Sequence, residues 1–147
     1  MESIAPSNEM SHSGMATCTL FNQSEDQVIS GSQDNSIIIW RINGTFIEFY
    51  SQLIKHKNTI VNISMNQQET EFASMSKDQQ IIIWGNISNK WKLKQIILQP
   101  GINFGDRVTF ISDNVLVFYQ IFERITYARS DIEFTKYHNK VLIQLIL

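Results

Sequence analysis

Short apolar runs alternate with polar turn residues along most of this chain. Asn, Asp, Gly, Gln and Ser separate one run from the next. No long segment places apolar residues at the 3.6-residue spacing of a helix face. The pattern therefore predicts short antiparallel strands, which we place over residues 15–21, 27–32, 36–42, 46–54, 59–65, 71–76, 80–84 and 91–98.

Two segments of the chain repeat each other at a spacing of 44 residues. Residues 30–40 align with residues 74–84, and both segments end in three isoleucines and a tryptophan. His12 and His56 keep the same spacing upstream. A fixed period in this range, with strand and turn signals inside it, is typical of a β-propeller blade. We therefore expect an all-β fold, a partial β-propeller of about three four-stranded antiparallel blades.

The repeat weakens beyond residue 100. Residues 108–111 and 115–119 still predict a hairpin, whereas the candidate strands over 122–128, 132–137 and 140–147 keep poor register with the earlier repeats. We divide the chain into a flexible segment and one propeller domain with a degenerate third repeat. The flexible segment covers residues 1–11, the domain covers 12–147, and the repeats cover about 12–54, 56–98 and 103–147.

At these residues the chain resembles the WD-repeat family of β-propellers. The resemblance implies a hydrogen-bonded network in each blade, built from a His before the first strand, a Ser in the second, an Asp in the next turn and a Trp in the third. The residues that fill these places are His12, Ser30, Asp34 and Trp40 in the first repeat, and His56, Ser74, Asp78 and Trp84 in the second. The chain departs from the family where Arg41 or Gly85 replaces the Asp after each Trp, and where Ser11 or Lys55 replaces the Gly before each His.

There is a physical reason for these four residue types to occur together. A buried carboxylate is costly unless it accepts several hydrogen bonds. Asp78 lies in a predicted tight turn, where it can accept from turn N–H groups and from the His56 imidazole. His56 can then bridge to the Ser74 hydroxyl, which can reach the indole N–H of Trp84. We expect a looser third blade, because the third repeat keeps none of the four residues.

Ser74, His56 and Asp78 are also the residue types of a hydrolytic triad. We interpret them as structural, because the same types recur one period away and a single active site does not repeat from blade to blade. The lone Cys18 and the three histidines lack the close spacing of zinc ligands. The sequence also has no glycine-rich phosphate loop. We therefore expect no enzyme activity and no catalytic, metal-binding or cofactor-binding residues.

Composition narrows the class of protein further. The formal net charge of −2 provides no strong attraction to nucleic acid or to an anionic membrane. A single cysteine excludes an internal disulfide and suits a reducing compartment. Residues 1–14 have no apolar signal region, and no apolar run is long enough for a spanning helix. We expect a cytoplasmic or nuclear protein that is not secreted, with no membrane span and no nucleic-acid partner.

The segment Lys90-Trp91-Lys92-Leu93-Lys94 is the most distinctive charged stretch. Strand alternation predicts its three lysines on one face and its two apolar residues on the other. A functional interpretation is a polyanion-binding surface for nucleic acid or acidic lipid. A structural interpretation is an outer strand whose lysines discourage pairing with other strands. The slightly negative net charge favours the structural interpretation.

The length of the chain conflicts with a closed ring. Closed propellers have roughly four to eight blades, whereas 147 residues at 44 per blade supply about three. We therefore expect a fragment, or a chain whose ring is completed by missing blades or by another chain. The WD-repeat resemblance implies a non-enzymatic scaffold that binds other proteins, with polyanion binding around Lys90–Lys94 as the alternative. Exposed loop residues that could contact a protein partner are Lys57, Asn58, Asn86 and Lys90.

Overall fold

The computed structural model describes residues 10–99, 105–121, 125–129, 132–136 and 139–145. These residues contain strands and turns and no helix, which confirms the all-β fold class. The described part of the chain accordingly has no helix long and apolar enough to cross a membrane. Of the expected flexible segment over residues 1–11, residues 1–9 lie outside the described part of the chain.

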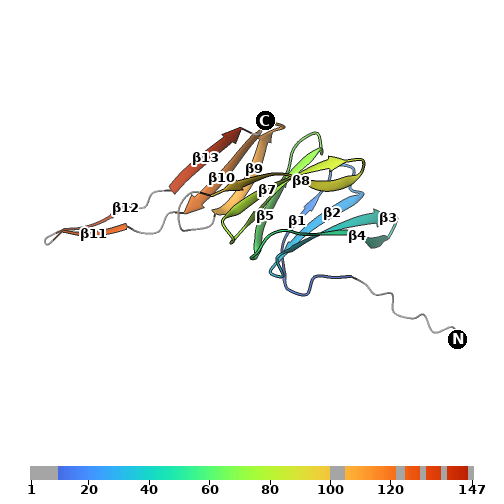
Figure 1. The fold of residues 1–147 in the computed structure, drawn as a ribbon, viewed down its shortest axis with the longest axis horizontal. Helices are drawn as coiled ribbons and strands as arrows, with labels where there is room; N and C mark the ends of the chain where they lie inside the picture. Colours follow the sequence, from blue (N-terminus) through green and yellow to red (C-terminus); the bar gives the residue numbers. More distant parts are fainter. Residues whose placement is uncertain (1–9, 100–104, 122–124, 130–131, 137–138, 146–147) are drawn as a thin grey trace.

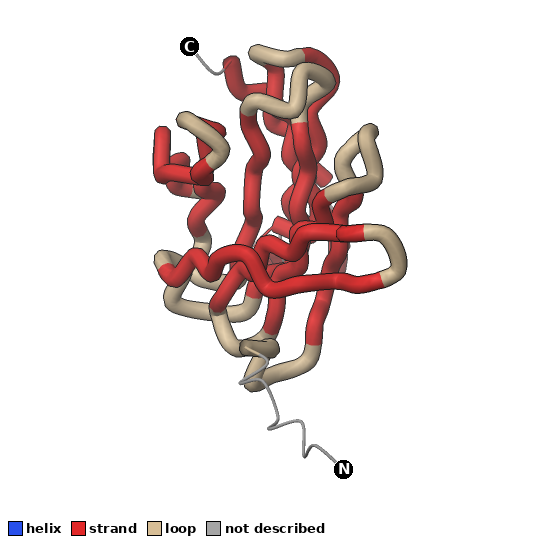
Figure 2. The backbone as a smooth tube through the Cα atoms, turned by 90° about the vertical axis from the view of Figure 1, so that its right-hand side faces the viewer, coloured by secondary structure: helices blue, strands red, loops and turns tan. Residues whose placement is uncertain are grey.

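The first two repeats each form a four-stranded antiparallel sheet, here called the first blade and the second blade. Consecutive strands are neighbours in both sheets. The first blade consists of β1 (Ala16–Phe21), β2 (Gln27–Ser32), β3 (Ser36–Asn43) and β4 (Phe46–Ile54). The second blade consists of β5 (Ile60–Met65), β6 (Glu71–Ser76), β7 (Gln80–Ile87) and β8 (Lys90–Leu98). The blades stack side by side (Figure 1), and their loops gather at the ends of the strands (Figure 2).

The third repeat departs from the four-stranded form. Its main sheet has three strands in the order β13-β10-β9, formed by Asn139–Leu145, Val115–Ile121 and Gly105–Ser112. The expected strands near 122–128 and 132–137 form instead a separate hairpin of β11 (Ile125–Arg129) and β12 (Ile132–Lys136). In Figure 1 this hairpin extends away from the three stacked sheets. The last apolar segment pairs directly with β10, so the hairpin is an insertion between the second and third strands of the sheet.

One position in each blade shows why the local sequence forms a tight turn. Asn35 and Gln79 occupy equivalent places between the second and third strands, with φ angles of 70° and 67°. This left-handed conformation lets the chain reverse direction within a few residues. The isoleucines that follow have the β-branched side chains that favour strands. Turn and strand signals therefore act together at the same place in both repeats.

The hydrophobic core lies between the sheets. One cluster joins the first and second blades, and its buried members are Ile29, Ile37, Ile39, Ile60, Ile63, Phe72, Ile82, Trp84 and Trp91. A second cluster joins the second blade to the third sheet, with Ala73, Met75, Ile81, Ile83, Val108, Leu116 and Phe118. The isoleucines of β7 point alternately into the two clusters. The second blade is consequently buried on both faces, as its continuous apolar strand predicts.

A glycine on β2 allows the first blade to approach β5 of the second blade closely. A Cβ atom added to Gly31 would lie 2.5 Å from Ile60 Cγ2 and 2.9 Å from Cys18 Sγ. Both distances are shorter than real Cβ contacts, so a larger residue at position 31 would force the neighbouring side chains to shift. Met75 occupies the equivalent place in the second blade and is fully buried. The interface between the first and second blades and the one between the second blade and the third sheet therefore contain different side chains at equivalent backbone positions.

Candidate functional site

The second blade contains a chain of hydrogen bonds that starts at Trp84 and ends at a carboxylate. Trp84 Nε1 donates to Ser74 Oγ at 2.9 Å, and Ser74 Oγ lies 2.8 Å from His56 Nε2. His56 Nδ1 lies 2.9 Å from Asp78 Oδ2. The network links the loop before β5, the strands β6 and β7, and the turn between them. It therefore holds the loop that carries the histidine against the turn that carries the aspartate.

The protonation of His56 sets the direction of these bonds. Burial lowers the pKa of His56, against the opposing effect of the Asp78 carboxylate. The imidazole is therefore neutral near pH 7, with one donor nitrogen and one acceptor nitrogen. Because a carboxylate only accepts, Nδ1–H donates to Asp78 and Nε2 accepts from the Ser74 hydroxyl. Each group in the chain then has a partner, as buried polar groups require.

Backbone groups complete the coordination of Asp78. The amide N–H groups of Lys57 and Gln80 donate to its two carboxylate oxygens at 2.8 and 3.0 Å. Together with His56, they give the carboxylate three donors, two from the loop before β5 and one from the start of β7. Such charge-assisted bonds are stronger than neutral ones. The geometry is that of a structural clamp, and the side chain of Asp78 is only 6% exposed.

The first blade repeats this network with one added hydroxyl. His12 contacts Asp34 Oδ2 at 3.1 Å and Ser30 Oγ at 2.8 Å, and Trp40 Nε1 donates to Ser30 Oγ at 2.8 Å. Ser36 also donates to Asp34, through its hydroxyl at 2.6 Å and its amide at 2.9 Å. Burial alone would raise the pKa of Asp34, but these bonds, the Ser13 amide and the nearby His12 hold that pKa well below its ordinary range. All eight residues singled out in the sequence thus come together as two groups of four.

Two further repeated devices were not singled out in the sequence. Ser32 and Ser76 are fully buried, and each accepts the amide of the network aspartate two residues later at 3.1 Å. Asn22 and Asn66 use their side-chain oxygens to accept two amides each in the turn between the first and second strands. Both pairs keep the 44-residue spacing, and that spacing was the signal that could have found them.

The residue types of a triad are present, but their surroundings differ from those of an active site. Ser74 is fully buried and His56 is 5% exposed, whereas a nucleophile must be accessible to a substrate. Burial also raises the pKa of the Cys18 thiol, which disfavours the reactive thiolate. Among the residues that the structure describes, no group of three or more His, Cys, Asp or Glu could hold a metal ion.

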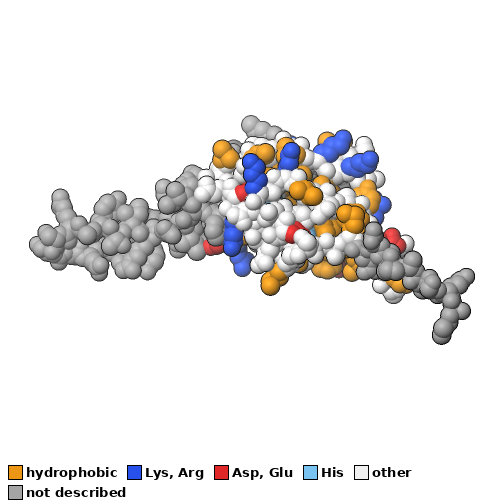
Figure 3. Space-filling view, turned by 60° about the horizontal axis from the view of Figure 1, so that its bottom comes forward, with side chains coloured by type: hydrophobic (Ala, Val, Ile, Leu, Met, Phe, Trp, Pro, Cys, Tyr) orange, Lys and Arg blue, Asp and Glu red, His pale blue; other side chains and the backbone are white. Residues whose placement is uncertain are grey.

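The basic segment on β8 follows the predicted alternation only in part. Trp91 is buried against the first blade, and its indole N–H donates to Gln27 at 3.2 Å. Lys90 and Lys92 are exposed, but a register shift near Lys94 interrupts the alternation, and Lys94 forms an ion pair with Glu71. The predicted face of three free lysines is therefore reduced to two. Figure 3 shows Lys and Arg side chains scattered among hydrophobic ones on one face of the molecule.

The loop residues proposed as contact positions lie at opposite ends of the second blade. Lys57 and Asn58 are exposed in the loop before β5, beside the turn that carries Asp78. Asn86 and Lys90 flank the turn between β7 and β8, where Asn86 is half-buried and its amide donates to Thr70 at 2.8 Å. The structure does not bring these four residues together into one surface.

The sheets and networks together define a partial β-propeller with WD-like blades. The fold is similar to the solved structure of U3-55K, a WD40 propeller protein, with a TM-score of 0.65 and 14% sequence identity. This likeness covers 77% of the chain but only 37% of the U3-55K chain. No family model and no curated protein matches the sequence. At this level of identity the likeness concerns the fold alone.

Proposed function

We propose that this chain is a non-enzymatic scaffold of the WD-repeat type that binds other proteins as part of a larger propeller. One observation carries the proposal. The chemically active side chains of Ser74, His56 and Asp78 are bonded to one another and to the backbone, and the same arrangement recurs in the first blade. Polar groups that bond to one another and recur in each blade stabilise the fold. The loops and rims of the blades remain available for partners, as the WD-like fold suggests.

Affinity capture followed by mass spectrometry tests the scaffold function. We expect the tagged chain to retain a defined set of proteins, and to lose members of that set when exposed loop residues such as Lys57 or Asn58 are changed to alanine without a change in melting temperature. An unrelated all-β protein with the same tag is the control. The proposal fails if the captured set equals that of the control. It also fails if the chain hydrolyses a simple ester and Ser74→Ala abolishes that hydrolysis while the fold is intact.

The outer face of the first blade supports the part of the proposal that concerns a larger propeller. Strand register places Trp40, Phe49 and Phe21 on the face opposite to the second blade. Phe21 is 58% exposed there, and Ile47 on the same face is 62% exposed. On the second blade the equivalent face is covered by the isoleucines of the first, which leaves Trp84 only 4% exposed. The fitting occupant is therefore a further blade with an aliphatic face of the same kind.

Dye binding and sedimentation test this open face. We expect the isolated chain to bind a hydrophobic dye or to self-associate, and the double variant Phe21→Ser with Ile47→Lys to do both less. Leu98→Lys, a change of a still more exposed apolar residue on the edge strand β8, is the matched control. A compact monomer that excludes the dye would contradict the open face. Completion by a second copy would appear as a stable dimer, and completion by other blades as loss of dye binding in a longer chain.

A further inference from the structure

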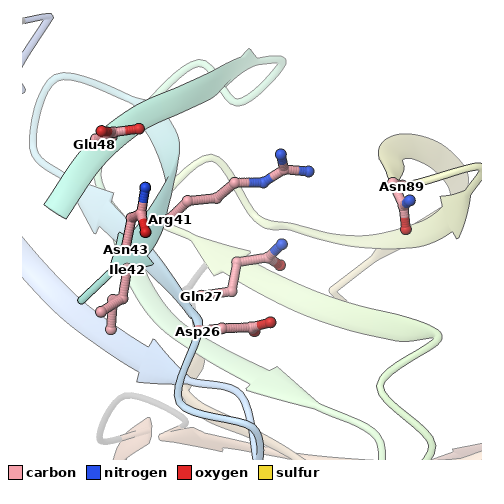
Figure 4. Close-up of a pocket in the computed structure, with 7 residues that line it drawn as sticks. All are labelled: Asp26, Gln27, Arg41, Ile42, Asn43, Glu48 and Asn89. Atoms are coloured by element: carbon pink, nitrogen blue, oxygen red, sulfur yellow. The ribbon is translucent and has the colours of Figure 1, made fainter. Parts of the chain in front are cut away.

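A polar pocket of about 480 Å³ lies at the rim between the first and second blades (Figure 4). Its walls come from the β1–β2 turn, from β2, β3 and β4, and from the β7–β8 turn of the second blade. The lining residues are Asp26, Gln27, Arg41, Ile42, Asn43, Glu48 and Asn89. The pocket is therefore separate from both hydrogen-bond networks.

Arg41 is the only cation among the lining residues, and its guanidinium has no acceptor among the described residues. The Cζ atom lies 3.6 Å from the centroid of the Tyr50 ring. Glu48 is directly opposite on the neighbouring strand, yet no ion pair joins the two. Figure 4 shows Arg41 pointing away from Glu48 and toward Asn89. In the part of the chain that the structure describes, the five N–H donors of Arg41 consequently have no partner.

Contacts between the blades fix the walls around Arg41. The Tyr50 hydroxyl donates to the carbonyl of Asn89 at 2.9 Å, and this bond holds the stacking ring in place. Gln27 accepts from Trp91 at 3.2 Å through its side-chain oxygen, which leaves its amide N–H₂ group to face a ligand. Gln27, Arg41 and Glu48 form one row across three adjacent strands. A rigid row of donors and acceptors lowers the entropy cost of binding.

This arrangement does not recur in the second blade, although the structural networks do. One period after Arg41 and Tyr50 stand Gly85 and Lys94, and Glu71 replaces Gln27. Lys94 and Glu71 form an ion pair with each other, so their charges are already satisfied. The first blade thus has a pocket at the place where the second blade has an ion pair. A feature that serves the fold would be expected in both blades, whereas this feature belongs to one.

We infer that the rim pocket binds a peptide segment in which an acidic side chain stands next to a basic one. A planar guanidinium with free N–H groups matches a carboxylate in two parallel hydrogen bonds. Asp26 and Glu48 give the pocket two negative charges beside one positive charge. This balance repels polyanions such as nucleic acid and favours a ligand that also carries a cation. The inference rests on the proposed scaffold function and specifies the chemistry of one partner.

Nuclear magnetic resonance titration of the ¹⁵N-labelled full chain tests the inference with the probe acetyl-Gly-Glu-Lys-Gly-amide. We expect saturable shifts at the side-chain signals of Arg41, Gln27 and Asn89. The analogue acetyl-Gly-Gln-Lys-Gly-amide, which keeps the lysine but lacks the carboxylate, should bind at least about 10-fold more weakly, because it loses a charge-assisted pair. Arg41→Gln should weaken binding of the acidic probe by the same factor. Lys92→Gln, which removes a positive charge from another exposed strand position, should leave it unchanged.

Three results would overturn the inference. They are equal affinity for the two peptides, equal weakening by Arg41→Gln and Lys92→Gln, and tighter binding of inorganic phosphate than of the acidic peptide at the same signals. Arg41→Lys separates recognition from folding, because it keeps the charge but loses the planar fork and should bind the probe weakly. Protein capture by wild type and Arg41→Gln keeps the two proposals distinct. If capture persists but the peptide does not bind, only the rim pocket is wrong.

Discussion

The first and second blades contain the same four-residue network, but they bury it to different degrees. Trp84 is 4% exposed because the first blade covers it, whereas Trp40 is partly exposed on the outer face of the first blade. The hydrogen-bond lengths are nearly equal, at 2.8 Å for Trp40 to Ser30 and 2.9 Å for Trp84 to Ser74. The hydrogen bonds therefore form within one blade, while burial of the network depends on its neighbour.

This difference separates two sources of stability. Hydrogen bonds between His, Ser, Asp and Trp organise the shape of a blade and need only residues of that blade. The free energy gained by burying apolar area requires a second sheet, as in repeat proteins generally. The same network residue should therefore contribute more to the free energy of unfolding in the second blade than in the first. The following substitutions test that expectation.

Removing the network tryptophan should have the largest effect. We expect Trp84→Ala to lower the free energy of unfolding by about 3–5 kcal/mol, because it leaves a cavity in the core and removes a donor to Ser74. Trp40→Ala should cost clearly less, since part of its ring already contacts water. Chemical denaturation with an unchanged m-value measures both changes. Equal losses would mean that another surface covers Trp40.

The close approach of Gly31 on β2 to Ile60 on β5 provides a second test. Gly31→Ala should lower the free energy of unfolding by about 1–3 kcal/mol, because the added methyl group would overlap the branched side chain of Ile60. Gly85→Ala is the matched control. Its nearest atom would be Lys94 Cβ at 3.9 Å, so the change should stay within about 0.5 kcal/mol. Thermal unfolding of both variants measures the difference. A tolerated Gly31→Ala would show that the blades can separate there at little cost.

The network aspartate should matter more than an exposed one. Asp78→Ala leaves His56 and two backbone amides without their acceptor, which should cost about 1–3 kcal/mol. Asp113 accepts one exposed amide, from Gln68 at 3.1 Å, so Asp113→Ala should cost much less. The midpoint of thermal unfolding reports both effects. Similar shifts for the two variants would contradict the clamp role of Asp78.

Lowering the pH should reduce the free energy of unfolding in two separate steps. The pKa of His56 is lowered by burial from its ordinary value of 6.5, so the unfolded chain takes up a proton first, and stability falls as the pH drops below about 6.5. The pKa of Asp34 is also lowered, so its contribution is present above its ordinary value of 3.8 and is lost below it. Each step has a slope of at most about 1.4 kcal/mol per pH unit.

Substitutions assign these two steps. His56→Gln should remove the change in unfolding free energy between about pH 7.5 and 5.5, and Asp34→Asn should remove the one below about pH 4. Denaturation curves at several pH values, at constant ionic strength, provide the measurement. If both variants keep the full pH dependence of the wild type, other groups govern the acid response.

A turn residue should give the smallest effect. Asn35 has a φ angle of 70°, and asparagine tolerates this conformation better than most residues. Asn35→Gln should therefore lower the free energy of unfolding by a few tenths to about 1 kcal/mol. Asn114→Gln, at a turn position without a positive φ, is the control and should have no comparable effect. A null result at Asn35 would mean that the surrounding network tolerates either side chain.

The features found by sequence analysis were those that depend on local spacing. The two four-stranded sheets follow from strand and turn signals within a few residues, and the partners of Asp78 follow from a repeated spacing. The insertion of β11 and β12 could not be predicted, because β13 pairs with β10 across a break in sequence order. The rim pocket was missed for a similar reason. Its key contact between Arg41 and Tyr50 depends on a ring that Asn89 of the next blade holds.

The sequence by itself determined the strands, the turns and the composition of each network, because these interactions form among neighbouring residues of one repeat. Only the tertiary structure decided which tryptophan is buried, where a glycine relieves crowding between two sheets, and which arginine has no acceptor among the described residues. Those outcomes depend on how one sheet lies against another. Burial and pairing across an interface are properties of two surfaces, and no single repeat encodes both of them.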